Sequence, residues 1–153
     1  GLSAQALWAD LENWEAPRSF SHVLLDAPCS ATGTIRRHPD LPLHRRRSDI
    51  EKSARLQSTL LERAADATTP GGTLVYCVCS LEPEEGEGVA RAFLASRDDF
   101  SLLAIGADEV PECLSMAVTA AGHVRTTPAM LAAPGGCDGF FAARFHKKAD
   151  AQT

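Results

Sequence analysis

Two short apolar runs on either side of one amphipathic segment constrain the fold of this chain more than any other feature of its sequence. The runs cover residues 22–26 (HVLLD) and 73–78 (TLVYCV). Continuous runs rich in branched and aromatic residues are typical of central strands that are buried on both faces of a parallel sheet. Residues 50–67 carry apolar side chains at spacings of three and four and are followed by a Thr-Pro-Gly-Gly turn, which indicates a helix. The sequence therefore predicts a strand, a helix and a second strand in an α/β fold.

The order of these elements also predicts where their ends lie. A crossover through a helix makes the two strands parallel neighbours, so their carboxyl ends meet at one edge of the sheet. We expect a second helix over residues 81–95, because Pro83 and the glutamates around it suit a first helical turn. Residues 100–105 and 139–145 are interpreted as further strands, and residues 7–11 (LWADL) as a strand that ends near an acid.

The composition indicates one soluble globular domain. The chain has 153 residues, 44% hydrophobic and 23% charged, and no apolar run approaches the roughly 20 residues that span a bilayer. Five cysteines without a disulfide-like spacing, and no amino-terminal signal pattern, make the reducing cytoplasm the expected location. The net charge of −5 argues against a uniformly basic nucleic-acid-binding protein. Residues 36–47, however, hold five arginines against a single acid, Asp40, and are a candidate for phosphate contact.

Three reactive side chains follow the two predicted strands. Asp26 ends the first strand, Cys29 lies shortly beyond it, and Cys79 follows the second strand. Ligands of open α/β sheets bind beyond the carboxyl ends of the strands, so we expect one cleft to hold both thiols and the carboxylate. Thiolates are strong nucleophiles, and a helix start close behind Cys79 would favour its ionised form. The other cysteines, interpreted as small buried apolar residues, are Cys77, Cys113 and Cys137.

Longer stretches around these residues resemble a known family. Residues 26–40 (DAPCSATGTIRRHPD) and 76–85 (YCVCSLEPEE) are similar to two signature motifs of the Sun family of RNA cytosine-5 methyltransferases, in particular the bacterial enzymes that act on small-subunit ribosomal RNA. Residues 124–128 (VRTTP) and 135–148 (GGCDGFFAARFHKK) are similar to the carboxyl-terminal pattern of that family. The resemblance implies a Rossmann-like class I methyltransferase fold, mainly parallel with an antiparallel terminal strand, and S-adenosylmethionine as methyl donor.

The resemblance also implies roles for individual residues. Cys79 is then the nucleophile that adds to C6 of cytosine, Cys29 assists release of the product, and Asp26 hydrogen-bonds the edge of the ring. Expected on the side of the donor are Asp10, Asp26 and Pro28. Expected contacts to the RNA substrate are Pro28, Ser30, Arg36, Arg37 and His38. Extraction of the target base from its stack is part of this activity.

The sequence departs from the family pattern at two points. Val78 stands where the family usually has threonine before the nucleophile. No glycine lies between Gly1 and Gly33, so the glycine-rich donor loop of the family is absent from this stretch. We therefore interpret the chain as the carboxyl-terminal half of one longer catalytic domain, with the amino-terminal strands missing. This half alone is predicted to bind S-adenosylmethionine weakly or not at all, and a calorimetric titration with micromolar affinity would contradict that.

Other functions remain open on the sequence alone. A DNA cytosine-5 methyltransferase would use Cys29 as its nucleophile, and a non-catalytic RNA-binding module would leave both thiols inert. A zinc site is disfavoured because the cysteine spacing does not match one. Expected partners are ribosomal RNA and the missing amino-terminal part of the same protein, and no membrane. An exposed sheet edge where that part would pack also predicts possible self-association.

Overall fold

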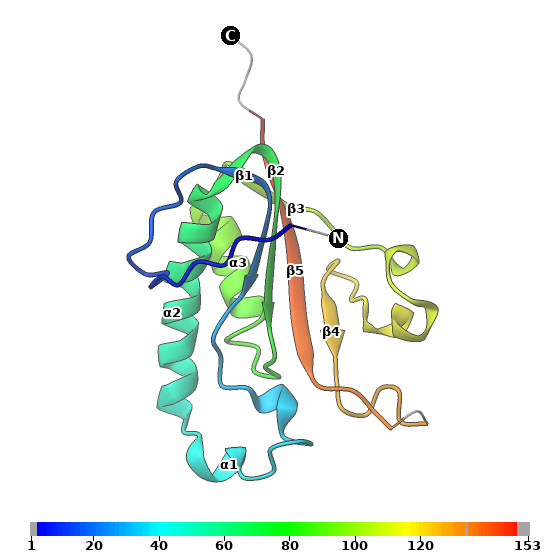
Figure 1. Cartoon of the computed structure of the whole chain (residues 1–153). Coiled ribbons are helices and arrows are strands. Elements are labelled where there is room, and N and C mark those ends of the chain that lie inside the picture. The colour runs from blue at the N-terminus through cyan, green and yellow to red at the C-terminus, as the bar shows by residue number, and fades with distance from the viewer. Residues whose placement is uncertain (1–2, 134, 150–153) are drawn as a thin grey trace.

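A computed structural model describes residues 3–133 and 135–149, and five strands form one sheet in it (Figure 1). The strands are β1 (Phe20–Asp26), β2 (Thr68–Val78), β3 (Phe100–Leu102), β4 (Val124–Thr126) and β5 (Phe140–Lys147). The α-helices are α1 (Leu41–His44), α2 (Arg47–Asp66) and α3 (Glu87–Ser96). Short stretches of 3₁₀ helix cover Thr32–Thr34, Ala107–Glu109 and Glu112–Ala117. Across the described ranges, no helix combines the length and the apolar character that crossing a bilayer requires.

The sheet is mixed, and one strand runs against the others. β1 and β2 are parallel neighbours, and β5 lies antiparallel on the other side of β2. β3 and β4 pair antiparallel with β5 at its two ends, and the strand order is β1-β2-β5-β3. The predicted Rossmann-like α/β fold with an antiparallel carboxyl-terminal strand is confirmed, and that strand lies inside the sheet between β2 and β3.

The predicted strand, helix and strand are β1, α2 and β2, and both strands are longer than expected. β2 starts almost directly after α2, so the predicted Thr-Pro-Gly-Gly turn lies within the strand. The register jumps there, from the pair Phe20 and Thr68 to the pair His22 and Thr73. Gly71 in this stretch has a φ of +77°, which glycine adopts without steric cost. The turn that was predicted to end the helix is therefore a bulge in the strand that follows it.

Residues 7–11 are not the strand that the sequence suggested. The segment is irregular and leads into a turn in which the Asn13 N–H donates to the carbonyl of Asp10 at 3.0 Å. Leu7 and Trp8 are 63% and 101% exposed. A strand needs a neighbour for its backbone hydrogen bonds, and none of the described strands pairs with this segment.

The second helix starts later than predicted. α3 begins at Glu87, and the residues before it form turns in which the N–H of Gly86 donates to the carbonyl of Glu82 at 3.2 Å. The sequence suggested that the glutamates complement a helix start, but the side chain of Glu85 is fully buried. Because that carboxylate points into the molecule, the chain turns once before the helix begins.

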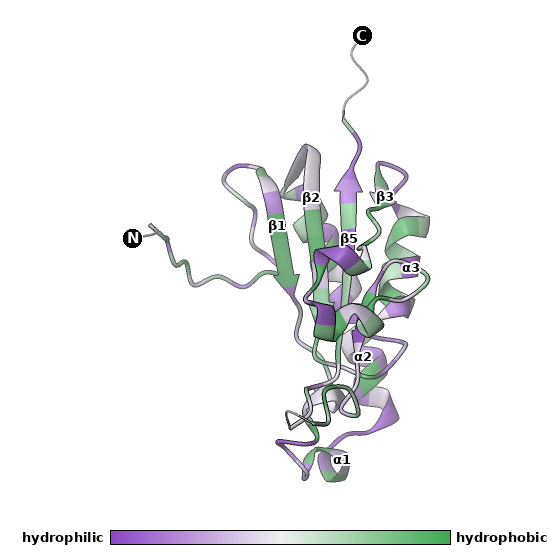
Figure 2. Ribbon diagram, turned by 90° about the vertical axis from the view of Figure 1, so that its right-hand side faces the viewer, coloured by the Kyte–Doolittle hydropathy of each residue, from purple (hydrophilic) through white to green (hydrophobic). Residues whose placement is uncertain are grey.

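β1 is an edge strand and not the central strand that its apolar run indicated. Among the described residues it pairs only with β2, and Leu24 is 68% exposed. Figure 2 shows β1 at one side of the sheet, with hydrophobic residues along it. α2 and α3 cover the opposite face, where Leu25 is buried (Figure 1). Only one face of β1 is therefore covered.

The core lies between the sheet and the two longer helices. Phe93 of α3 stacks in a tilted geometry on Phe145 of β5 and Phe100 of β3, with ring centroids 4.9 and 5.1 Å apart. Fully buried core side chains, at 0% exposure, are Leu61, Ala65, Leu74, Tyr76, Val78, Phe141, Ala143 and Phe145. β2 and β5 contribute most of them, so these two neighbours are the best buried strands of the sheet.

Phe145→Ala is expected to lower the free energy of unfolding by about 3–5 kcal/mol, because it removes a fully buried ring and leaves a cavity against Phe93. Urea unfolding followed by circular dichroism measures the loss. Phe140→Ala in the same strand is the matched control, since that side chain is only half-buried. Equal losses in the two variants would contradict this assignment of the core.

Candidate active site

Cys29 and Cys79 are in contact at the carboxyl edge of the sheet. Cys29 follows β1 and Cys79 follows β2. Their Sγ atoms lie 3.4 Å apart although 50 residues separate them in the chain. Both side chains are half-buried, so they are packed but not sealed from solvent. The expectation that parallel neighbours bring the two thiols together is confirmed.

A glycine lets the loop after β1 close onto Cys79. The N–H of Gly33 donates to the carbonyl of Cys79 at 3.0 Å, and the N–H of Gly139 donates to the carbonyl of Gly33 at 2.8 Å. A Cβ at position 33 would overlap the carbonyl group of Gly139. Only glycine permits this approach, which ties the two cysteine-bearing turns to the start of β5.

Burial changes the acidity of two cysteines at this edge. It raises the pKa of Cys29 to about 12, and the hydrogen bond and negative charge of Cys79 add to the rise. Burial also raises the pKa of Cys77 to about 12, with the Asp26 carboxylate as a further cause. Cys29 and Cys77 therefore keep their protons at neutral pH.

Asp26 lies at the same edge and contacts Cys77. The two residues pair in the register of β1 and β2, and Oδ1 of Asp26 is 3.7 Å from Sγ of Cys77. The carboxylate of Asp26 and the ring of Pro28 are exposed. The structure thus joins the two site thiols directly and leaves the acid at the end of β1, open to solvent.

Ser30 is not available for the RNA contact that the resemblance implies. Its side chain is 1% exposed, and its hydroxyl donates to the carboxylate of Glu85. The hydroxyl also lies 3.2 Å from Oγ of Ser80. The residue after Cys29 therefore points into the protein, where it holds the turn in place.

Arg36, Arg37 and His38 are exposed, and the arginines have protein partners. Nε of Arg37 donates to Oδ2 of Asp138 at 2.9 Å, which lowers the pKa of that carboxyl. Arg36 donates to the carbonyl of Gly135. These contacts tie the loop after β1 to the loop before β5. Contact of the three side chains with RNA stays a prediction.

Asp10 closes a turn. Its Oδ2 accepts a hydrogen bond from Nδ2 of Asn13 at 2.8 Å, and its Oδ1 accepts one from the N–H of Glu12 at 3.1 Å. The strand end expected here does not exist, and the carboxylate of Asp10 serves the turn instead. The role implied by the resemblance stays a prediction.

The other side chains that the sequence singled out take no part in the contact between Cys29 and Cys79. Val78 is fully buried in the core, and Cys77 is buried as predicted. Cys113 is exposed and Cys137 is half-buried, with its Sγ 3.2 Å from the carbonyl of Thr127. The prediction of burial was wrong for Cys113, because the loops and 3₁₀ turns of residues 106–123 leave it outside the core.

Three buried polar residues close to the cysteine-bearing turns were not predicted from the sequence. Glu85, Gln57 and Tyr76 are each fully buried and hydrogen-bonded to one another. One signal for them was available, since Gln57 lies on the apolar face of α2, one turn before Leu60 and Leu61. A polar side chain on such a face requires a partner in the core.

A pocket of about 420 Å³ adjoins the two cysteine-bearing turns. Its lining includes Arg45, Arg46 and Arg47, around the start of α2, and Glu82 and Glu84, from the turns after Cys79. We call it the arginine pocket. Nε of Arg45 donates to the carbonyl of Ser30 at 2.9 Å, so the pocket is linked to the turn that carries Cys29.

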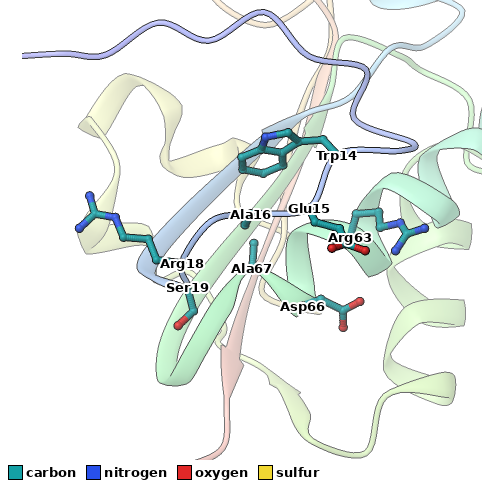
Figure 3. A pocket seen from close by; sticks show the side chains of 8 residues that line it. All are labelled: Trp14, Glu15, Ala16, Arg18, Ser19, Arg63, Asp66 and Ala67. Carbon is teal, nitrogen blue, oxygen red and sulfur yellow. The ribbon is translucent and has the colours of Figure 1, made fainter.

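A second pocket, of about 320 Å³, lies at the opposite end of β1. Figure 3 shows its walls, which come from the segment before β1, with Trp14 and Arg18, and from the end of α2, with Arg63 and Asp66. It contains no cysteine and lies near the amino end of β1. The candidate active site is therefore the carboxyl edge and not this pocket.

Comparisons with known proteins agree with these features. The model of the family 16S rRNA methyltransferase RsmB/F matches residues 3–146. Ribosomal RNA small subunit methyltransferase B of Cronobacter sakazakii is 41% identical over 135 residues, which are 88% of this chain and 28% of the relative. The protein of the same name from Klebsiella pneumoniae (strain 342) is 48% identical over 100 residues, which are 65% of this chain and 23% of the relative.

Solved structures show the same likeness. NSun6 from Pyrococcus horikoshii has a TM-score of 0.70 and 29% identity, with 94% of this chain and 34% of that chain covered. A methyltransferase homologue from the same organism has a TM-score of 0.63 and 34% identity, with 85% of this chain and 40% of that chain covered.

The Rossmann-like sheet is similar to the sheets of these solved structures, and this similarity assigns the chain to the class of methyltransferases. Within that class, the chain belongs to the 16S rRNA methyltransferase RsmB/F family. The resemblance to the Sun family is thereby confirmed. The chain spans 28% of the length of the Cronobacter relative.

Proposed function

We propose that this chain is the carboxyl-terminal part of the catalytic domain of an S-adenosylmethionine-dependent RNA cytosine-5 methyltransferase that modifies ribosomal RNA. One observation carries the proposal, which is the 3.4 Å contact between two half-buried thiols at the carboxyl edge of the sheet. Ligands of α/β sheets bind at this edge. Family membership supports the class of reaction.

The thiol pair suits the chemistry that C5 methylation needs. C5 of cytosine is a weak nucleophile, and addition of the Cys79 thiolate to C6 forms an S–C6 bond and moves electron density onto C5. C5 then takes the methyl group. Loss of the C5 proton restores the C5–C6 double bond and expels the Cys79 sulfur, so the enzyme is regenerated.

Two observations support a role for Cys29 in the last of these steps. Its raised pKa keeps the thiol protonated, and its Sγ lies 3.4 Å from that of Cys79. A protonated Cys29 donates a hydrogen bond to the sulfur that leaves C6, and this stabilises the departing thiolate. A protonated Cys29 in contact with the proposed nucleophile thus supports separate roles of nucleophile and release group.

The described residues fit one wall of a donor site. S-Adenosylmethionine, when bound, supplies an electrophilic methyl group. Asp26 and Pro28 are exposed at the end of β1, where a carboxylate can accept hydrogen bonds from a ligand. Asp10 fits less well because its carboxylate already accepts two hydrogen bonds in its own turn. A similar structure, NSun6, was determined with SFG, an analogue of S-adenosylmethionine.

The arginine pocket supports binding of the RNA backbone. Three consecutive arginines line it beside the turn of Cys29, and phosphates are the usual partners of such clusters. Glu82 and Glu84 also line the pocket, and their negative charges offset part of the positive charge of the arginines. Arg36, Arg37 and His38 extend the same loop, so a strand of RNA could run along it toward the thiols.

The open edge of β1 supports a longer protein as the working unit. β1 has described backbone partners on one side only, and Leu24 on its face is 68% exposed. An amino-terminal part of the same catalytic domain would pair with the open side of β1 and cover Leu24. If that part is absent, this edge is where two copies of the chain would associate.

Methylation of ribosomal RNA by the full-length protein tests the proposal. The protein is incubated with unmodified small-subunit ribosomal RNA and isotopically labelled S-adenosylmethionine, and the RNA is digested to nucleosides for mass spectrometry. The expected product is labelled 5-methylcytidine. Label on another nucleoside, label on DNA alone, or no label would each contradict the proposal.

A further inference from the structure

We propose that Glu85 is a positioning residue of the active site, a buried carboxylate that sets the separation of Cys29 and Cys79. The inference rests on the proposed function, in which both thiols act on one base. Glu85 lies in the turn between Cys79 and α3, and its side chain is 0% exposed.

Three segments of the chain that are distant from one another donate hydrogen bonds to the Glu85 carboxylate. The N–H of Ser30 donates to Oε1 at 2.8 Å, and the hydroxyl of Ser30 donates to Oε2. The hydroxyl of Ser80 donates to Oε2 at 2.5 Å, and Nε2 of Gln57 donates to Oε1 at 3.0 Å. Both carboxylate oxygens therefore accept two hydrogen bonds each.

The two serines are the residues that directly follow the two cysteines. Their carbonyls are held as well, since Nε of Arg45 donates to that of Ser30 at 2.9 Å and Nη1 of Arg125 donates to that of Ser80 at 2.7 Å. Each cysteine-bearing turn is thus held at the hydroxyl and at the carbonyl of its serine. Because one carboxylate binds both hydroxyls, it fixes one turn relative to the other.

The energetics favour a positioning role over simple space filling. Removal of a carboxylate from water costs several kcal/mol, and here neutral donors offset that cost. An apolar side chain of similar volume would avoid the cost altogether. A fully satisfied buried network instead selects one arrangement of the segments that it joins. The hydrogen bonds of Glu85 end on the serines, so its effect on the thiols is indirect.

Ser80→Ala in the full-length protein tests the link between Glu85 and the thiols. It removes one donor and one oxygen atom, and we expect kcat to fall about tenfold while KM for RNA changes by less than about twofold. Tyr76→Phe is the matched control. It removes the 2.5 Å hydrogen bond to the Glu85 carbonyl and the 3.2 Å hydrogen bond to Oε1 of Gln57 but touches neither serine, and we expect kcat within about twofold of wild type.

Two variants at position 85 distinguish a positioning role from an effect of the negative charge. Glu85→Gln keeps the length, and its amide can bond the same groups once the serine hydroxyls rotate to accept. Glu85→Asp keeps the charge but is one methylene too short to reach both serines. We expect Glu85→Gln to retain about tenfold more kcat than Glu85→Asp. The reverse order would overturn the proposal.

A probe of the thiol pair makes the test independent of methylation. Phenylarsine oxide binds two adjacent thiols by forming two As–S bonds and releasing its oxygen as water with the two thiol protons, without any redox change. Mass spectrometry of peptides that contain Cys29 and Cys79 reports the bridged fraction during a titration. We expect about tenfold weaker bridging in Ser80→Ala and unchanged bridging in Tyr76→Phe.

Equal bridging in Ser80→Ala and wild type would overturn the positioning role. If wild type bridges the arsenical and Ser80→Ala does so weakly, while no RNA is methylated, the positioning of the thiols stands and the proposed function fails. The two inferences therefore fail on different measurements.

Discussion

Cys79→Ala is expected to abolish the covalent adduct between the full-length protein and RNA that carries 5-fluorocytosine, and to lower methyl transfer more than about a thousandfold. The sulfur at position 79 is the atom that we propose adds to C6, and methylation at C5 depends on the electrons that this addition supplies. Fluorine at C5 cannot leave as a proton does, so the wild-type adduct survives denaturing electrophoresis. Its mass equals one protein, one RNA and one methyl group.

Cys113→Ala is the control for loss of a thiol as such, because Cys113 is exposed and lies outside the active site. This variant is expected to form the adduct as wild type does. An adduct that persists in Cys79→Ala but disappears in Cys29→Ala would assign the nucleophile to Cys29, as in DNA cytosine-5 methyltransferases. Absence of an adduct from every protein, wild type included, would favour a non-catalytic RNA-binding module.

Cys29→Ala is expected to have the opposite effect and to trap the protein on ordinary RNA. Without the protonated thiol 3.4 Å from Cys79, expulsion of the sulfur from C6 loses its hydrogen-bond donor. Release of the methylated base is expected to slow about a hundredfold, within the range typical of general acid catalysis. The measurement is the fraction of protein that migrates with RNA on a denaturing gel after incubation with the methyl donor and unmodified cytosine.

The double variant Cys29→Ala with Cys79→Ala supplies the control, since it removes the nucleophile and must eliminate the trapped band. Cys113→Ala should release RNA at the wild-type rate. If Cys29→Ala turns over normally and leaves no band, the thiol at position 29 has no part in release, and its contact with Cys79 must be explained by packing.

Local patterns predicted the central unit of the fold well. The apolar runs before Asp26 and Cys79, with the helical spacing between them, indicated β1, α2 and β2 in the order and orientation observed. From the crossover rule alone, Cys29 and Cys79 were expected at one edge. Such patterns depend on residues that are close together in the chain, so the sequence alone is enough to detect them.

Predictions failed where a segment depends on residues far away in the chain. Residues 7–11 have the composition of a strand but no described neighbour to pair with. The acids around Pro83 suit a helix start, yet Glu85 turns inward to bond Ser30, 55 residues earlier. The apolar face of β1 suggested burial, and Leu24 is exposed because the two longer helices pack on the other face.

The sequence by itself determined the class of fold, the family and the pair of cysteines on which the proposed chemistry depends, because periodicity and contiguous motifs are local properties. Only the tertiary structure decided that the two sulfurs touch, that burial raises the pKa of Cys29, and that Glu85 holds both turns from within. The contacts of Cys29 with Cys79 and of Ser30 with Glu85 join residues 50 and 55 positions apart, and burial and hydrogen bonding over such separations exist only once the chain has folded.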